Sequence, residues 1–344
     1  MNVLIILAVL LTIFVLVRLT NIVQLAAELS GESEEIENKR DNKINGILLV
    51  GFMVVGLGLM VYMTLRYNKY MLPVSATEHG VELDNLLNWN FAVIGLVFFI
   101  TQIALFWFAY KYRFNKERRA YFYPDNHKLE LIWTIIPTIV LSVLIVTGLA
   151  SWNKITQSEH TDGMKVEIYG YQFNWIARYA GKDNKLGSSY YKNINDENAL
   201  GVNYNDPAAA DDIMTKGNEM HLPVGIPIAM EFHAREVLHS AYFPHLRTQM
   251  NCVPGMTTSF YFKPTITTTE MRKITKNDNF DYILLCNKVC GVAHYTMKMK
   301  VVIDTPEDFK KWLKGEKRVV PSPAADAKIT ENTSVEKDKQ VALK

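Results

Sequence analysis

Cysteine is scarce in this sequence, and neither sign of charge predominates. The chain has three cysteines among 344 residues, and none stands in the CxxCH pattern that attaches a c-type haem, so no such haem is carried by this chain. Lys and Arg number 37 against 35 Asp and Glu, a near balance that does not indicate nucleic acid binding. Hydrophobic residues are abundant instead, at 49%, which is high for a purely soluble protein.

Four apolar blocks account for this excess: residues 3–17, extending weakly to 27, and residues 44–65, 91–110 and 131–150. A membrane-spanning helix needs roughly 20 apolar residues, and the last three blocks reach that length without an internal charge. They predict membrane helices. The first block could be a cleaved secretory signal, but no basic residue precedes Val3 and no cysteine lies near it for a lipid anchor. We therefore interpret residues 1–65 as an extra transmembrane hairpin.

The distribution of basic residues predicts the orientation in the membrane. The loop between the third and fourth blocks carries six of them: Lys111, Arg113, Lys116, Arg118, Arg119 and Lys128. The loop over residues 66–90 carries only Arg66 and Lys69. Short loops rich in Lys and Arg stay in the cytoplasm, so both termini and everything after Trp152 are expected on the opposite side of the membrane.

The region after the membrane helices has the pattern of a small all-β domain. Short strand-like runs separated by Gly, Pro and Asn predict an antiparallel sandwich or barrel; they cover residues 166–179, 226–234, 257–269, 282–286 and 297–304.

Local composition then divides the chain. Residues 181–218 are polar and predict a surface insertion, and residues 304–314 predict a closing helix capped by Asp304 or Thr305. The last stretch, residues 318–344, has too little apolar content to fold and is expected to be disordered. The predicted organisation is an extra hairpin (1–65), an extracytoplasmic loop (66–90), a second hairpin (91–152), a β domain (165–314) and a tail.

The stretch CNKVCGVAHYTM, residues 286–297, contains two of the three cysteines. In an oxidising compartment a disulfide is the ordinary interpretation of CxxxC, but it leaves His294 and Met297 unexplained. Zinc would accept two cysteines and a histidine, yet has no particular use for a methionine. Thiolate, imidazole and thioether together are the donors that copper prefers. A ligand from elsewhere in the chain is needed too, and His239 in the run EVLHSAYFP is the candidate.

The second thiol distinguishes between kinds of copper site. A mononuclear blue-copper site uses one cysteine, two histidines and a weak axial methionine, so a second thiolate is surplus unless it bridges a second metal ion. Two bridging thiolates with one terminal histidine on each ion would complete a binuclear centre, which spreads one unpaired electron over both ions.

The motifs together resemble subunit II of cytochrome c oxidase, the family that carries the binuclear copper centre CuA. They are CxxxCxxxHxxM at residues 286–297, VLHS at 237–240, GNEMHLPVG at 217–225, VPG at 253–255 and LELIWTIIPTIVL at 129–141. The resemblance covers the chain from Phe91 to about Leu313. It implies a cupredoxin-like sandwich on the periplasmic side of a bacterial inner membrane, anchored to a haem-containing subunit I by the hairpin at 91–152.

The resemblance also implies roles for individual residues. Cys286 and Cys290 would bridge two copper ions, His239 and His294 would be terminal ligands, and Met297 and the backbone carbonyl of Lys288 would bind weakly. Electrons would come from cytochrome c and pass to haem in subunit I, where oxygen is reduced and protons are translocated. Glu130 matches the carboxylate at the mouth of a proton pathway, although a carboxylate in a first helical turn is also favoured by the helix dipole alone.

Three departures from the family pattern stand out. Phe173 and Asn174 replace the Trp and Tyr of many members, so electrons could pass near Phe173 or use Tyr171 or Trp175. Lys288 stands where a glutamate often binds magnesium at the subunit I boundary, so that ligand is expected to be missing. Cys252 is an additional thiol, which we interpret as a buried apolar residue rather than a redox or metal-loading group. The extra hairpin could pack on subunit I or on a neighbouring respiratory complex in a supercomplex.

Four other classes of protein share part of this pattern. Quinol oxidase subunit II has the same anchoring but has lost the copper ligands. Copper-delivery proteins use CxxxC with a distant histidine but lack the LELIWTIIP hairpin. The copper domain of nitrous oxide reductase is joined to a propeller, not to a membrane anchor. A membrane sensor with a structural disulfide explains neither His239 nor Met297, so cytochrome c oxidase subunit II is the favoured interpretation.

Overall fold

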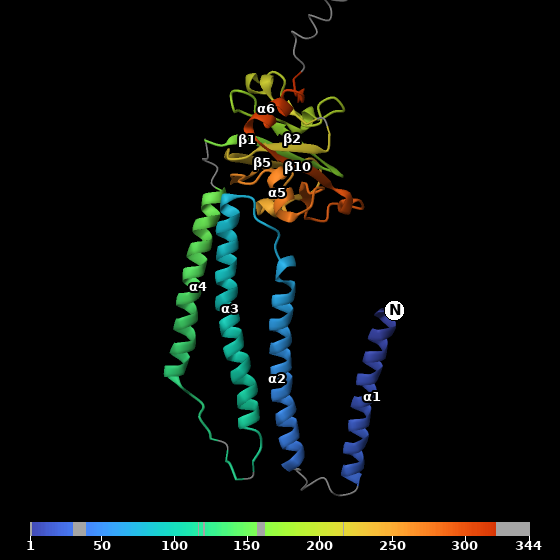
Figure 1. Cartoon of the computed structure of the whole chain (residues 1–344), viewed down its shortest axis with the longest axis vertical. Helices are drawn as coiled ribbons and strands as arrows, with labels where there is room; N and C mark the ends of the chain where they lie inside the picture. Colours follow the sequence, from blue (N-terminus) through green and yellow to red (C-terminus); the bar gives the residue numbers. More distant parts are fainter. Residues whose placement is uncertain are drawn as a thin grey trace, which may run out of the picture. The chain divides into compact units, whose positions relative to one another are not determined.

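The computed structural model describes residues 2–29, 39–115, 117–119, 121–156, 162–215 and 217–320 (Figure 1). The chain divides into two compact units. One comprises Met1–Asn68 with Ile94–Asp125, and the other comprises Lys69–Val93 with Asn126–Lys344. Most of the predicted tail, from residue 321 onward, lies outside the described residues.

The first unit is helical. It contains α1 (Asn2–Leu29), α2 (Lys39–Tyr67) and the later part of α3 (Glu78–Lys111). Helices α2 and α3 meet through the rings of Phe52 and Phe106, whose centroids are 6.0 Å apart. The amide of Asn42 donates a 2.7 Å hydrogen bond to the carbonyl of Phe114 just beyond α3.

Three helices in the described part of the chain are long and apolar enough to cross a membrane: Asn42–Tyr70, Glu78–Lys111 and His127–Thr156. They coincide with the last three apolar blocks, and this part of the prediction is confirmed. Within α1, the shorter segment Phe14–Val23 is apolar, so a membrane-spanning role for α1 stays a prediction.

The second unit contains α4 (His127–Thr156), the first turns of α3 and two β-sheets (Figure 1). The larger sheet has the strand order β11-β3-β2-β1-β5-β8 and the smaller one β4-β10-β9-β6-β7. The strands are β1 (Met164–Tyr171), β2 (Asn174–Tyr179), β3 (Ile213–Met214), β4 (Glu219–Pro223), β5 (Ile228–Ala234), β6 (His239–Phe243), β7 (Thr248–Cys252), β8 (Thr258–Phe262), β9 (Tyr282–Cys286), β10 (Lys298–Asp304) and β11 (Lys317–Arg318). The predicted all-β fold class, attached to apolar helices, is confirmed. The expected antiparallel pairing is wrong in part, because β1 pairs parallel with β5 and β10 pairs parallel with β4.

Alternating burial explains why these segments form strands. In β5 every second residue is buried, beginning with Ile228, and β10 buries Met299, Val301 and Ile303. Side chains of a strand point alternately to its two faces, so β5 and β10 each direct one apolar face into the main core. The largest fully buried side chains there include Trp175 and Phe232.

Helix α3 begins at Glu78, well before the predicted start at Phe91, so the loop predicted over residues 66–90 is partly helical. Thr77 caps the helix, because its hydroxyl accepts a 3.1 Å hydrogen bond from the Gly80 N–H. Just before the cap, Ala76 donates to the His245 carbonyl at 2.7 Å and accepts from the Thr265 N–H at 2.9 Å. These hydrogen bonds hold the first turns of α3 to the β domain. Because these turns are polar, the search for apolar blocks in the sequence did not find them.

Two predicted strand runs differ from the structure. Residues 166–179 form two strands, β1 and β2, that pair antiparallel. Residues 257–269 form β8 and then enter α5 (Thr268–Thr275), which a capping box of Thr267 and Glu270 begins. The closing helix is α6 (Pro306–Leu313), and its predicted cap is confirmed as Thr305, whose hydroxyl accepts from the Asp308 N–H.

The polar segment at 181–218 has a small core of its own. Leu200, Val202 and Ala209 are buried together with Tyr169 and Val319. The segment includes β3, which joins β2 to β11, so the larger sheet continues past residue 314.

Candidate metal centre

The two thiols of the CxxxC motif lie at the end of β9 and in the loop that follows it. Backbone hydrogen bonds close this loop: Cys286 N donates to Met297 O at 3.1 Å, and Asn287 N donates to Ser240 O at 2.9 Å. Gly291 adopts φ +138°, which an L side chain rarely takes. These bonds turn the chain back on itself, so side chains at both ends of the loop meet.

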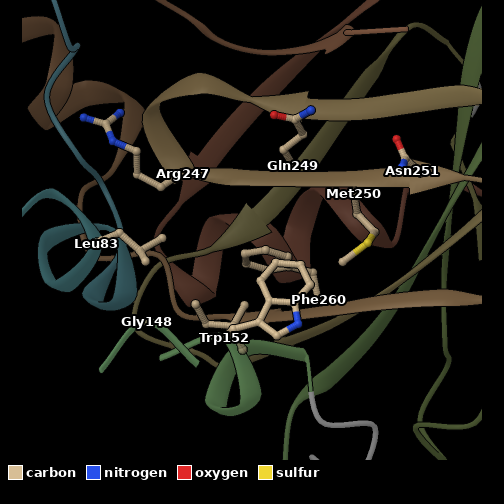
Figure 2. Close-up of a pocket in the computed structure, with 9 residues that line it drawn as sticks. Leu83, Gly148, Trp152, Arg247, Gln249, Met250, Asn251 and Phe260 are labelled. Atoms are coloured by element: carbon tan, nitrogen blue, oxygen red, sulfur yellow. The ribbon is translucent and has the colours of Figure 1, made fainter. Parts of the chain in front are cut away.

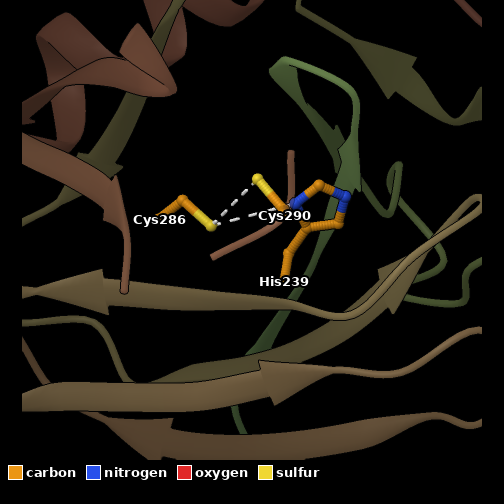
Figure 3. Close-up of side chains that lie close together, drawn as sticks. All are labelled: His239, Cys286 and Cys290. Carbon is orange, nitrogen blue, oxygen red and sulfur yellow. Dashed lines mark hydrogen bonds between the residues drawn. The ribbon is translucent and has the colours of Figure 1, made fainter. Parts of the chain in front are cut away.

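His239 reaches the same place from the first position of β6, which pairs with β9. Its side chain is fully buried. Nδ1 of His239 lies 3.8 Å from Sγ of Cys286, and Cys286 Sγ lies 3.8 Å from Cys290 Sγ (Figure 3). One ligand atom from each of the three residues lies within 4.8 Å of the others. A strand far away in sequence therefore supplies the donor that the loop could not supply itself.

The other candidate donors surround the thiols. His294 Nδ1 lies 3.5 Å and Met297 Sδ 3.7 Å from Cys290 Sγ. The carbonyl oxygen of Lys288 lies 3.2 Å from Cys286 Sγ, while the Lys288 side chain is exposed. The structure thus brings together all six groups that the sequence analysis named as candidate metal ligands.

The donor set fits a soft metal better than a disulfide. A disulfide requires an S–S distance of about 2.05 Å, whereas these sulfurs are 3.8 Å apart and unbonded. With metal–thiolate bonds of about 2.3 Å, one metal ion could contact both sulfurs. A second ion could contact the same two sulfurs from their opposite side. Two thiols, two imidazoles and a thioether are the donors that favour copper.

Burial sets the protonation of these groups. It lowers the pKa of His239, which favours the neutral imidazole that a metal needs. Burial, with a smaller effect from the neighbouring Cys286, raises the pKa of Cys290 to about 11. A bound cation would reverse this by favouring the thiolate, so metal binding would release protons here.

The aromatic residues beside the centre differ in exposure. Trp175 is buried, and its ring meets His239 edge-on at 6.0 Å between centroids. Phe173 is partly exposed and lies against Gly291 in the metal loop, where an added Cβ would approach its ring to 2.9 Å. Tyr171 ends β1 and is also partly exposed. Of the three, Phe173 combines contact with the loop and access to solvent.

Sequence reasoning missed two residues that support the centre. The Gln172 amide donates a 2.5 Å hydrogen bond to the Cys290 carbonyl. At Gly170, an added Cβ would lie 2.9 Å from Trp175 and 3.2 Å from His239. A glycine within a run of strand residues can mark such a close approach, and this was the one available signal.

Two singled-out residues do not belong to the cluster of donors. Glu130 lies in the first turn of α4, where its carboxylate is 3.2 Å from His127 Nδ1. Cys252 is fully buried in β7 and lies opposite His239 in the β6–β7 ladder. Burial raises the pKa of Cys252 to about 12, which suits an inert thiol.

The chain is similar to several known proteins. Residues 66–153 match the family described as cytochrome C oxidase subunit II, transmembrane domain. The alternative cytochrome c oxidase subunit 2 of Bradyrhizobium diazoefficiens is 33% identical over 242 residues, which are 70% of this chain and 82% of that protein. Cytochrome c oxidase subunit 2 of Thermostichus vulcanus is 24% identical over 276 residues, covering 74% and 80%. Among solved structures, the periplasmic domain of subunit II of a Bradyrhizobium japonicum cytochrome oxidase matches with a TM-score of 0.30 and 16% identity, covering 45% of this chain and 94% of that one.

Proposed function

Because this membrane chain belongs to the cytochrome c oxidase subunit II family, we propose that it accepts electrons from cytochrome c and passes them to haem in subunit I, where oxygen is reduced and protons are translocated. The observation that supports this is the pair of thiols 3.8 Å apart, with two imidazoles and a thioether around them. In this role the chain transfers electrons and makes or breaks no bond in a substrate.

We propose that the centre holds two copper ions, bridged by Cys286 and Cys290. His239 and His294 would be terminal ligands, with Met297 and the Lys288 carbonyl as weak ones. The bound copper would supply a one-electron redox couple shared between two ions. The protein's contribution is to hold these donors still, because a centre that changes shape little between redox states transfers electrons with little reorganisation.

Packing supports that rigidity. Met297 and Cys290 are almost fully buried, and His239 is completely so. The Gln172 amide fixes the Cys290 carbonyl, and the Asn287 N–H fixes the loop to β6. His239, Cys290 and Met297 are therefore restrained by their packing, and Cys290 also by a hydrogen bond from outside the ligand set.

For electron reception we favour Phe173 over the two alternatives. Its ring lies against the metal loop and is accessible from outside. Trp175 is buried against His239 and is suited to an inner position, whereas Tyr171 shares no hydrogen bond or ring contact with the metal loop in the described part of the chain.

The magnesium site of the family would lack its subunit II ligand here. Lys288 presents an exposed ammonium group, which cannot coordinate a cation. Subunit I and water would have to supply every contact to a metal ion at that boundary.

We propose that the β domain lies on the periplasmic side of a bacterial inner membrane. This follows from the basic loop around Arg118, which is expected in the cytoplasm. Glu130, at the same end of α4, is then on the cytoplasmic side, where a proton pathway would open. The extra hairpin of α1 and α2 would contact subunit I or another respiratory complex.

Copper content and electron paramagnetic resonance of the purified full chain test the copper assignment. Two coppers per chain, with one unpaired electron shared equally between them, are expected for the unaltered protein. Cys286→Ala should lose this signal, and Cys252→Ala, which removes the thiol outside the donor set, should retain it. One copper with the spectrum of a single ion would favour copper delivery, and a bonded pair of cysteines without copper would favour a disulfide-stabilised module.

A further inference from the structure

Glu236 lies in the turn between β5 and β6, three residues before the candidate ligand His239. Its side chain is exposed, and its carboxylate accepts a 2.7 Å hydrogen bond from the backbone N–H of Gln172. In the described part of the chain this carboxylate is in no ion pair, so its charge is not compensated. A glutamate that bonds one N–H can be an ordinary surface residue, and the contacts of Gln172 decide whether Glu236 does more.

Gln172 and Phe173 form the turn between β1 and β2, and both contact the metal loop. The side-chain amide of Gln172 donates a 2.5 Å hydrogen bond to the Cys290 carbonyl. A Cβ added at Gly291 would lie 2.7 Å from that amide nitrogen and 2.9 Å from the Phe173 ring. The turn therefore packs closely against the loop, and a shift of the turn would move both contacts.

The hydrogen bond from Gln172 to Glu236 holds this turn in place. The pairing of β1 with β2 ends at Tyr171 and Asn174, so the Gln172 N–H lies beyond the ladder and the carboxylate is its partner. The charge of Glu236 also reaches the site: burial lowers the pKa of His239, and the charge of Glu236 is the largest effect that opposes this. Glu236 thus acts on the centre both through a hydrogen bond and through its charge.

We propose that Glu236 is a positioning residue of the metal centre, which holds the turn at Gln172 and Phe173 against the metal loop and places a negative charge near the copper ions. The second part rests on the proposed function, because it requires the copper centre. The oxidised centre carries one more positive charge than the reduced centre, so a negative charge nearby favours the oxidised state. The hydrogen bond of Glu236 goes to Gln172 and not to a ligand, so Glu236 acts on the loop indirectly.

Hydrogen–deuterium exchange of the metal-free full chain in detergent, followed by mass spectrometry, tests the first part without copper. Glu236→Ala removes the acceptor. Amide exchange in the β1–β2 turn and in the metal loop should then rise about five- to tenfold, as expected for the loss of one hydrogen bond. Glu236→Gln keeps a side-chain oxygen that can accept the same bond, and its exchange should stay within about twofold of the unaltered chain.

A second pair of variants tests the order of the contacts. Gln172→Ala removes the bond to the Cys290 carbonyl and keeps the bond to Glu236, so exchange should rise in the metal loop and not in the turn. Gln249→Ala is the matched control. Gln249 is an exposed glutamine whose amide Figure 2 shows pointing away from Trp152 and Phe260, and its side chain has no hydrogen bond among the described residues. Exchange of the metal loop should be unchanged in this control.

A redox titration of the copper-loaded chain tests the second part. At a fixed potential, the ratio of oxidised to reduced centre should fall about two- to fivefold in both Glu236→Ala and Glu236→Gln, because both remove the charge. Glu307→Ala is the control, since this exposed glutamate of α6 follows the end of β10 that is remote from Met297. Its ratio should not change.

Four results would overturn the proposal: unchanged exchange in Glu236→Ala, exchange in Glu236→Gln as fast as in Glu236→Ala, an unchanged redox ratio in both variants, or weaker binding of cytochrome c as the sole effect. If the chain binds no copper, the proposed function fails, while the exchange experiment still decides the positioning role.

Discussion

Substituting Gly170 by alanine should disturb the packing behind the metal centre. The added Cβ would lie 2.9 Å from Trp175 and 3.2 Å from His239, and the first distance is too short to exist without a shift. Overpacking of this kind costs about 1–3 kcal/mol, while replacing glycine stabilises by about 0.4–1 kcal/mol through the unfolded chain. The net loss should be about 1–2 kcal/mol of the free energy of unfolding. Because His239 is one of the two rings displaced, copper affinity should fall as well.

Urea unfolding of the full chain in detergent measures this loss through the near-ultraviolet circular dichroism of buried Trp175. With a slope of about 2 kcal/mol/M, the midpoint should fall by about 0.5–1 M. Gly217→Ala is the matched control, because nothing lies within 4 Å of its added Cβ, and its midpoint should stay the same or rise. An unchanged midpoint and unchanged copper content in Gly170→Ala would refute the close approach of Trp175 and His239 to this backbone.

Three further predictions test other parts of the structure. Burial raises the pKa of Asp212 to about 6, above its unfolded value of about 3.9; the stability that this group contributes is thus present below about pH 4 and lost as pH rises through about 6. In Asp212→Asn this decrease in the free energy of unfolding, about 1–3 kcal/mol between pH 4 and 7 in the unaltered protein, should be absent. If the urea midpoints of the variant and the unaltered protein changed with pH in parallel, the reasoning would be contradicted. Lys288→Glu should restore a divalent ion at the subunit I boundary, detectable as bound manganese in the assembled oxidase, and no gain of metal would count against the missing-ligand argument. Arg247→Ala leaves the partly buried Asp84 unpaired and should lower the free energy of unfolding by about 2–4 kcal/mol. Arg272→Ala breaks a more exposed pair and should lower it by less than about 1 kcal/mol. Equal urea midpoints for the two variants would show that the Arg247–Asp84 pair does not hold α3 to the β domain.

Most of the candidate ligands of the metal centre could be predicted from their spacing along the sequence. Cys286, Cys290, His294 and Met297 lie within one loop, so their order along the chain already implied that they could meet. His239 required more, because its proximity depends on the pairing of β6 with β9. That pairing connects residues far apart in sequence, and only the chemistry of the remaining donors made this histidine the expected partner.

The sequence predicted secondary structure correctly where apolar and polar residues alternate regularly. The prediction failed where a helix cap determined that a segment is helical. Strand β9 coincides with the predicted run at 282–286, and β10 differs from its run by one residue. The β-branched residues before α5 suggested a longer strand, yet the capping box of Thr267 and Glu270 begins a helix there. Likewise Thr77 begins α3 within a polar stretch. Hydrogen bonds at single positions outweighed the propensity of the segment in both cases.

The strand that carries His239 also connects the metal centre with the membrane. Strand β6 ends at Phe243, and the residues that follow it form the contacts with α3: the His245 carbonyl accepts from Ala76, and the Arg247 guanidinium pairs with Asp84. Strand β6, which is five residues long and begins with the candidate copper ligand His239, thus connects that ligand to the segment that contacts the helix. A β-strand held in a sheet resists extension and bending far more than a loop does. Since electron transfer depends steeply on distance, such a connection would keep the separation between the centre and the membrane helices constant while donor proteins bind and leave.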